Sequence, residues 1–381
     1  MTDQIKLLEP LKIRNVTIPN RIVISPMCQY SAHDGYLGAW HFVHLGRFAT
    51  GGAGLIFTEA TAVQKYGRIT HGCPGLWCDS QIAGHKQVTS FALQNGAIPA
   101  LQLGHAGRKA GMQRPWFGNS FLNEVDFARG DIPWQSVGPS PLPVDQGWPV
   151  PHEMTQAEIG AFVDDFVTAT KRALQAGYKV LEIHGAHGYL LHSFLSPLSN
   201  QRKDDYGVSL KNRMRLVTEV ATQVRAAWPS DLPLFFRISS VDGASDGWSI
   251  QDSVKLTNCL KTIGVDVIDC SSGGISGSAT AGNTKKLRPG FQVPYAAQIR
   301  AETGIKTMTV GLITHAFQAE EILSDGCADL IAIGREALAN PNWALHAAQA
   351  LYGSENFENW PKQSGWWLKR RAASSDLYRP T

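Results

Sequence analysis

The chain has 381 residues, a formal net charge of +3, 43% hydrophobic residues and 18% charged residues. This size suits one large domain or two ordinary ones, and so small a net charge argues against a nucleic-acid-binding surface. No stretch approaches the roughly 18 apolar residues of a membrane span, and the N-terminus lacks an apolar signal core. The six cysteines form no Cys-x-x-Cys pair, so reduced thiols in a cytoplasmic protein are expected.

Short apolar runs alternate with amphipathic stretches along the whole chain. In chain order, strands are predicted at 21–26, 54–60, 98–103, 179–184, 234–239, 265–270, 307–311 and 329–334. Several are apolar throughout, as parallel strands buried on both faces should be. Helices are predicted at 155–176, 211–228, 251–263, 294–303, 315–325 and 341–352. The first begins with the capping box Thr155–Glu158 and ends before Gly177, which suits the position after a helix.

Eight strand–helix units in series predict a closed (β/α)8 TIM barrel, an α/β fold, as a single domain over residues 1–381. An open doubly wound sheet is the alternative, but its Gly-x-Gly-x-x-Gly signature is absent. After the third strand, residues 110–151 lack helical periodicity and contain seven prolines, which predicts a capping insertion. The tail, 353–381, holds Trp360, Trp366 and Trp367 and is too apolar for a loose end.

Side chains at the C-terminal ends of the strands line the active site of such a barrel. The glycines that follow the last three strands, together with Arg335, form a candidate phosphate cradle. His184, His187 and Tyr189 follow the fourth strand in one short turn. Two imidazoles in a turn can polarise a carbonyl beside an acidic phenol, or they can be hydrogen-bonded structural histidines. A zinc site ranks below both because no carboxylate lies in this turn, and no metal is expected.

Five motifs in order resemble the Old Yellow Enzyme family, from Leu7 to Trp367. They lie at 20–21, 26–30, 105–109, 184–189 and 199–207. A cysteine follows Pro26-Met27, and in this feature the chain resembles the bacterial branch of xenobiotic reductases and NADPH dehydrogenases. The resemblance implies non-covalently bound FMN and NADPH as the hydride donor.

The resemblance also implies roles for individual residues. Along the flavin ring it places Ser25, Pro26, Met27, Cys28, Ala60, Gln102 and Arg237, with the arginine beside the flavin N1. Around the ribityl phosphate it places Ser272, Gly273, Gly274, Gly311, Gly334 and Arg335. His184 and His187 would bind the substrate oxygen, Tyr189 would donate the proton, and Tyr30 would form a pocket wall.

The implied activity is a ping-pong reduction of alkenes conjugated to a carbonyl or nitro group. Two alternatives stay open: a flavin-free barrel lyase or aldolase with Lys109 as Schiff-base nucleophile, and a non-catalytic ligand-binding barrel. The expected partners are small molecules and a second copy of the chain, in a homodimer or a dimer-based oligomer. Trp367 of the tail would complete a neighbour's substrate site, or Trp366 and Trp367 would fold back onto their own barrel. The chain departs from the family pattern at Val208, where a glycine is common, and at Ser364, where one relative has arginine.

Overall fold

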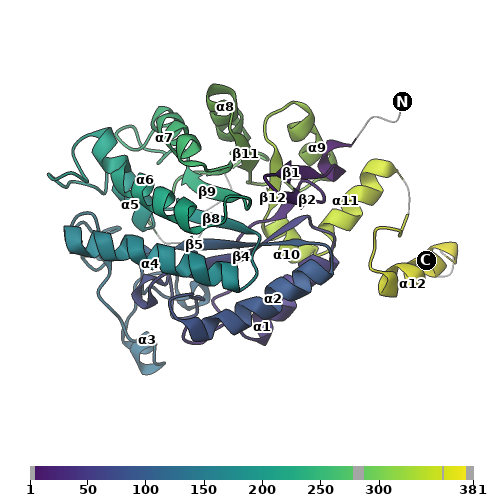
Figure 1. Cartoon of the computed structure of the whole chain (residues 1–381). Helices are drawn as coiled ribbons and strands as arrows, with labels where there is room; N and C mark the ends of the chain where they lie inside the picture. Colours follow the sequence, from purple (N-terminus) through teal and green to yellow (C-terminus); the bar gives the residue numbers. More distant parts are fainter. Residues whose placement is uncertain (1–4, 278–286, 354–355, 375–381) are drawn as a thin grey trace.

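The apolar runs predicted as strands pair side by side into a closed parallel barrel ringed by helices (Figure 1). The computed structural model describes residues 5–277, 287–353 and 356–374. The barrel strands are β3 (Ile22–Ile24), β4 (Leu55–Ala62), β5 (Ile98–Gly104), β8 (Val180–Gly185), β9 (Leu234–Ser239), β10 (Val267–Ser271), β11 (Lys306–Thr309) and β12 (Leu330–Ile333). Their order is β10-β11-β12-β3-β4-β5-β8-β9, and β9 pairs with β10 to close the ring. The predicted (β/α)8 fold is confirmed.

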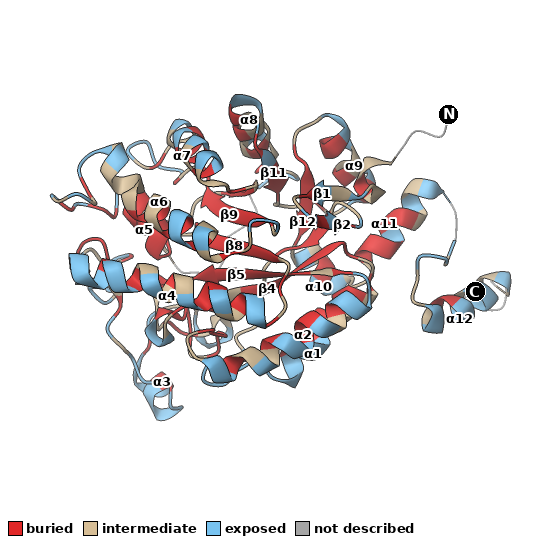
Figure 2. Cartoon of the chain, in the orientation of Figure 1, coloured by how far each residue is buried: buried red, intermediate tan, exposed pale blue. Residues whose placement is uncertain are grey.

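Alternate residues of each strand point into the barrel, because successive side chains of a strand face opposite sides. One layer of the interior is apolar and includes Val23, Phe57, Ala100, Phe235 and Met308. A hairpin of β1 (Leu11–Ile13) and β2 (Val16–Ile18) packs against this apolar cluster. The barrel strands are buried along nearly all of their length in Figure 2, as expected for parallel strands covered by helices.

Helices cover the outside of the barrel and turn their apolar faces inward (Figure 2). They are α1 (Ala39–Thr50), α2 (Ile82–Gln94), α4 (Gln156–Gln175), α6 (Leu210–Ala227), α7 (Ile250–Ile263), α8 (Val293–Thr303), α9 (Ala316–Ser324) and α11 (Trp343–Tyr352). The sequence did not predict α1 and α2. Their buried faces include His41, His44 and His85, which weaken the apolar periodicity that marks a helix.

The 110–151 insertion has more regular structure than its sequence predicts. It contains α3 (Glu124–Ala128), which Asn123 caps by accepting from the Val125 and Asp126 amides, and β6 (Val137–Gly138), which pairs with β7 (His152–Glu153). Arg114 Nη1 lies 2.5 Å from Asp131 Oδ2 within the insertion. Side chains from other segments also hold it: Arg202 Nη1 donates to the carbonyl of Pro139 at 3.1 Å.

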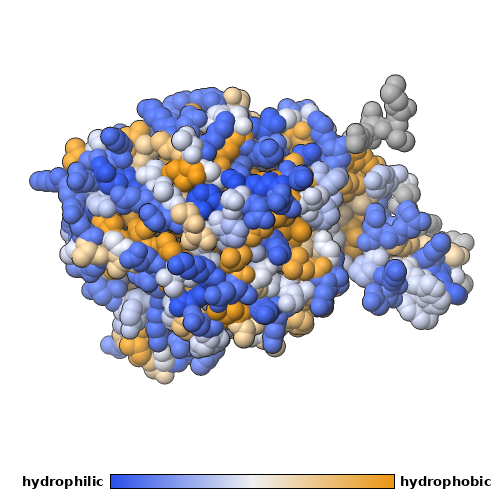
Figure 3. Space-filling model, in the orientation of Figure 1, coloured by the Kyte–Doolittle hydropathy of each residue, from blue (hydrophilic) through white to orange (hydrophobic). Residues whose placement is uncertain are grey.

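The tail forms α12 (Lys362–Ala373), which stands off the barrel beyond α11 in Figures 1 and 3. Two further helices are short. Helix α5 (Leu190–Leu195) follows the turn after β8, and helix α10 (Arg335–Ala339) follows β12. Among the described helices, none combines the length and the apolar character that a membrane span needs.

Candidate active site

The side chains of His184, near the end of β8, and of His187 and Tyr189, in the turn that follows, converge at the C-terminal end of the barrel. The ring of His184 lies 5.1 Å from that of His187 and 4.9 Å from that of Tyr189, measured between centroids. The turn is tight because His187 and Gly188 both adopt left-handed conformations, with φ of 60° and 72°. A Cβ at Gly188 would lie 2.1 Å from the carbonyl oxygen of Gly274, so this position requires glycine. The predicted constellation is therefore brought together.

Burial determines the protonation of these groups. Burial and the nearby Arg237 guanidinium lower the pKa of His184 and of His187 well below the usual value, so both imidazoles are neutral. Burial raises the pKa of the Tyr189 phenol well above its usual value, so it keeps its proton. His184 Nδ1 accepts from the Ala186 amide at 3.2 Å, which leaves the proton on Nε2. The site thus offers neutral donors to an oxygen.

The backbone of this turn is held by side chains that the sequence did not single out. Ser239 Oγ accepts from the His187 amide at 2.9 Å, and His192 Nδ1 accepts from the Gly188 amide at 2.8 Å. His192 Nε2 lies 2.8 Å from Asp242 Oδ1 in a bent contact, with both side chains fully buried. Only the tertiary structure reveals these supports, because Asp242 is far from the turn in sequence.

Lys109 supports the same turn rather than facing a substrate. Its residue is 1% exposed, and Nζ donates to the carbonyl of His187 at 3.0 Å and to that of Gly274 at 2.5 Å. Burial, with Arg108 nearby, lowers the pKa of Lys109 to about 7. An amine tied to two carbonyls in the interior is poorly placed as a Schiff-base nucleophile.

Below the turn lies a layer of buried polar groups. Arg237 Nε is 3.1 Å from Asp269 Oδ2, and Gln102 Nε2 donates to Glu182 Oε1 at 2.8 Å. Burial raises the pKa of both carboxyls, most strongly that of Glu182. Arg237 Nε, Glu182 Oε2 and both Asp269 oxygens are buried without a hydrogen bond among the described residues. Such an incompletely satisfied layer fits a polar heterocycle that carries both donors and acceptors.

The segment after β3 faces the same turn. Cys28, Tyr30 and Ala60 pack against a cluster that contains Cys73 and Tyr189. Burial, and then the Glu59 carboxylate, raise the pKa of the Cys28 thiol well above its usual value, so it is not a thiolate nucleophile. Ser25 is buried, while Pro26 and Met27 are half-buried beside it.

The predicted phosphate cradle is partly open. Gly273 and Gly274 have φ of 69° and 86°, and a Cβ at Gly273 would meet no atom within 4 Å. A Cβ at Gly334 would meet only Met27 Sδ at 3.9 Å, and Arg335 is exposed. Open backbone next to a guanidinium fits a phosphate group. Ser272 and Gly311 are less free: Ser272 Oγ donates to Gln292 Oε1 at 2.8 Å, and Gly311 lies against Phe291.

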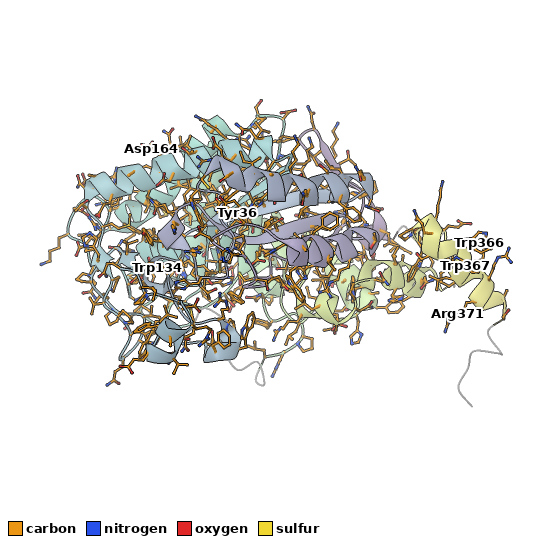
Figure 4. All side chains as sticks on the ribbon, turned by 90° about the horizontal axis from the view of Figure 1, so that it is seen from below. Tyr36, Trp134, Asp164, Trp366, Trp367 and Arg371 are labelled. Carbon is orange, nitrogen blue, oxygen red and sulfur yellow. The ribbon has the colours of Figure 1, made fainter. Side chains whose placement is uncertain are left out.

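Trp367, predicted to bind substrate, lies away from the turn in this single chain. It lies on α12 with 66% of its surface exposed, at the far end of the molecule in Figure 4. Within the described ranges, no cluster of three His, Cys, Asp or Glu side chains is placed to hold a metal ion.

Comparison with known proteins identifies the family of the chain. The family model described as "NADH:flavin oxidoreductase / NADH oxidase family" matches residues 6–354. An NADPH dehydrogenase of Geobacillus sp. (strain WCH70) is 44% identical over 91% of this chain and 94% of its own. One of Geobacillus thermodenitrificans (strain NG80-2) is 42% identical with the same coverage.

Solved structures show the same fold. Morphinone reductase in complex with tetrahydroNAD aligns over 91% of each chain, with a TM-score of 0.74 and 25% identity. An Old Yellow Enzyme homologue from Zymomonas mobilis aligns over 90% of this chain and 92% of its own, with a TM-score of 0.73 and 24% identity. The chain therefore belongs to the NADH:flavin oxidoreductase / NADH oxidase family, the Old Yellow Enzyme family, and is an NAD(P)H-dependent flavin oxidoreductase that uses FMN.

Proposed function

We propose that this enzyme uses NADPH to reduce the C=C bond of alkenes conjugated to a carbonyl or nitro group. One observation carries the proposal: two neutral imidazoles and a neutral phenol converge on one small space at the end of β8. A non-catalytic binding barrel would have no need of such a set of proton-bearing groups.

His184 and His187 would bind the substrate oxygen. The Nε2–H of His184 faces Nδ1 of His187 at 3.4 Å, and Nε2 of His187 lies 2.7 Å from Ser271 Oγ. When the Ser271 hydroxyl donates to His187 Nε2 instead of to Gln292 Oε1, His187 carries its proton on Nδ1. The N–H groups of His184 and His187 then no longer bond to each other, and both can donate to a substrate oxygen. Two donors aimed at one oxygen stabilise the negative charge that develops on it as the double bond is reduced.

Tyr189 would supply the proton to the α-carbon. Its phenol is protonated and buried, with its ring edge-on to that of His184. FMN held at this site would supply the hydride chemistry that links the nicotinamide to the alkene. We assign to the flavin ring Ser25, Pro26, Met27, Cys28, Ala60, Gln102 and Arg237, with Arg237 as the fixed cation. We assign to the phosphate Gly273, Gly274, Gly334 and Arg335. The FMN is held without a covalent link.

The experiment separates the two half-reactions. Anaerobic NADPH should bleach the flavin, and 2-cyclohexenone or a nitroalkene should then restore its absorbance with formation of the saturated product. Bleaching by NADPH without any product from either alkene would refute the proposal while leaving the NADPH-dependent flavin chemistry intact.

We further propose that α12 packs against a second copy of the chain in a dimer-based oligomer. Trp366 and Trp367 are 52% and 66% exposed, and their rings lie 4.5 Å apart. Arg370 stacks over the Trp366 ring at 4.0 Å. Adjacent exposed indoles are frequent interface anchors. Truncation after Pro361 should lower the mass in solution and change the KM for enones; unchanged mass and kinetics would refute the shared contact.

A further inference from the structure

A surface cleft of about 790 Å³ lies beside the active site, between the segment after β4 and the 110–151 insertion. Cationic and aromatic side chains dominate its lining. The lining includes Asp34, Lys65, Tyr66, Arg68, Arg114, Arg129, Asp131 and Trp134.

The cleft carries excess positive charge. Its lining contains four cations, Lys65, Arg68, Arg114 and Arg129, against two carboxylates, Asp34 and Asp131. A third carboxylate, Asp126, lies behind Arg129 at 2.9 Å, outside the lining. Asp131 is committed to Arg114, whereas Asp34 lies 3.4 Å from Lys65 Nζ and 4.0 Å from Arg68 Nη1. Lys65 and Arg129 are partly exposed, so their charges reach a ligand in the cleft.

An aromatic surface lies next to these charges. The ring of Trp134 is 5.9 Å from that of Tyr66, and its Nε1 donates to the carbonyl of Tyr66 at 2.7 Å, which fixes the indole. The Arg68 guanidinium stacks 5.2 Å from the Trp134 centroid. A cationic group beside an aromatic face is the combination that recognises a phosphorylated nucleoside, since every base has a face that stacks.

The cleft connects to the reacting groups through shared residues. Arg68 also lines a small gap that is bordered by His184 and Tyr189. Arg114 Nε donates to the carbonyl of Tyr30, which packs against Tyr189. The cleft is far from α12, as the position of Trp134 in Figure 4 shows, so it is distinct from the proposed contact of the tail. A dinucleotide whose nicotinamide reaches the flavin must extend its adenosine end to such a neighbouring surface.

We infer that this cleft binds the 2′-phosphoadenosine end of NADPH. The 2′-phosphate lies against Lys65 and Arg129, whose side chains are partly exposed, and the adenine stacks on the exposed ring of Tyr66. The inference uses the NAD(P)H dependence of the family and does not depend on which alkene is reduced.

Calorimetry on the FMN-loaded enzyme tests it with two probes, 2′,5′-ADP and 5′-AMP. The wild type should bind 2′,5′-ADP about tenfold more tightly, because only this probe carries the 2′-phosphate. Lys65→Gln together with Arg129→Gln should weaken the binding of 2′,5′-ADP about tenfold and leave the affinity for 5′-AMP nearly unchanged. Lys86→Gln on α2, outside the cleft, removes the same charge per residue and should leave the affinities for both probes unchanged.

A variant of opposite sign guards against loss of folding as an explanation. Asp34→Asn removes the carboxylate that competes for Lys65 and Arg68, and should tighten 2′,5′-ADP by about two- to threefold. Asparagine tolerates the left-handed backbone of Asp34, whose φ is 44°. In steady state, the Lys65/Arg129 double variant should raise the KM for NADPH and not that for NADH. Equal effects on NADPH and NADH, equal binding of the two probes by the wild type, or weaker binding by Asp34→Asn would each overturn the inference.

Discussion

Replacing His192 by leucine should destabilise the fold and disorder the catalytic turn. The imidazole is 0% exposed; its Nδ1 accepts from the Gly188 amide at 2.8 Å, and its Nε2 contacts Asp242 at 2.8 Å. Leucine leaves the Gly188 N–H buried without an acceptor, which costs about 1–3 kcal/mol. The lost contact with Asp242 costs about 1 kcal/mol more, because Asp242 keeps donors from Ser196 and the Trp248 amide. The sum is about 2–4 kcal/mol.

Urea denaturation measures the stability, and stopped-flow absorbance measures the two half-reactions. Because the turn carries His187 and Tyr189, His192→Leu should slow alkene reduction more than NADPH-dependent bleaching of the flavin. His192→Asn can still accept from the Gly188 amide and should recover part of both losses. This role would be refuted if the free energy of unfolding of His192→Leu lay within about 0.5 kcal/mol of the wild-type value and both half-reactions kept their rates. That margin is roughly the scatter of neutral surface changes.

The same pair predicts a pH dependence. Burial raises the pKa of Asp242, but the close contact with His192 and the hydrogen bonds from Ser196 and the Trp248 amide outweigh it and hold the pKa below its usual value. The stability that Asp242 adds is therefore complete above its unfolded pKa of about 4 and is lost as the pH falls through its folded pKa. Asp242→Asn should flatten acid unfolding below about pH 4, as followed by circular dichroism; an unchanged acid profile would show that Asp242 does not contribute.

Three further changes test the site and one loop. Tyr189→Phe should slow alkene reduction by roughly 10²–10⁴-fold and spare reduction of the flavin by NADPH, as pre-steady-state traces would show; equal slowing of both steps would contradict its role as proton donor. His184→Ala with His187→Ala should weaken phenol and enone binding by about 3 kcal/mol while FMN content stays constant. Val208 is 71% exposed with φ of 66°, so Val208→Gly should raise the free energy of unfolding by about 1 kcal/mol. Val43→Gly, at an exposed position of α1, should lower the free energy of unfolding by a similar amount.

The sequence by itself determined the barrel because its strands carry a local signal. Strands buried on both faces must be apolar throughout, and the predicted strand 234–239 coincides with β9. Helix α4 begins where the capping box Thr155–Glu158 places it, since both partners of that box lie within one turn. The sequence did not predict helices α1 and α2, because histidines occupy part of their buried faces and weaken the apolar periodicity that marks a helix.

The sequence also placed His184, His187 and Tyr189 together, because the first ends a predicted strand and the other two lie in the turn directly after it. What supports that turn was decided only by the tertiary structure. Lys109 Nζ reaches the carbonyls of His187 and Gly274, and Asp242 meets His192 from the loop after β9. These contacts join residues that are distant along the chain, and no local pattern encodes them. They form because closing the barrel brings all strand ends to one rim, where buried polar groups must find partners.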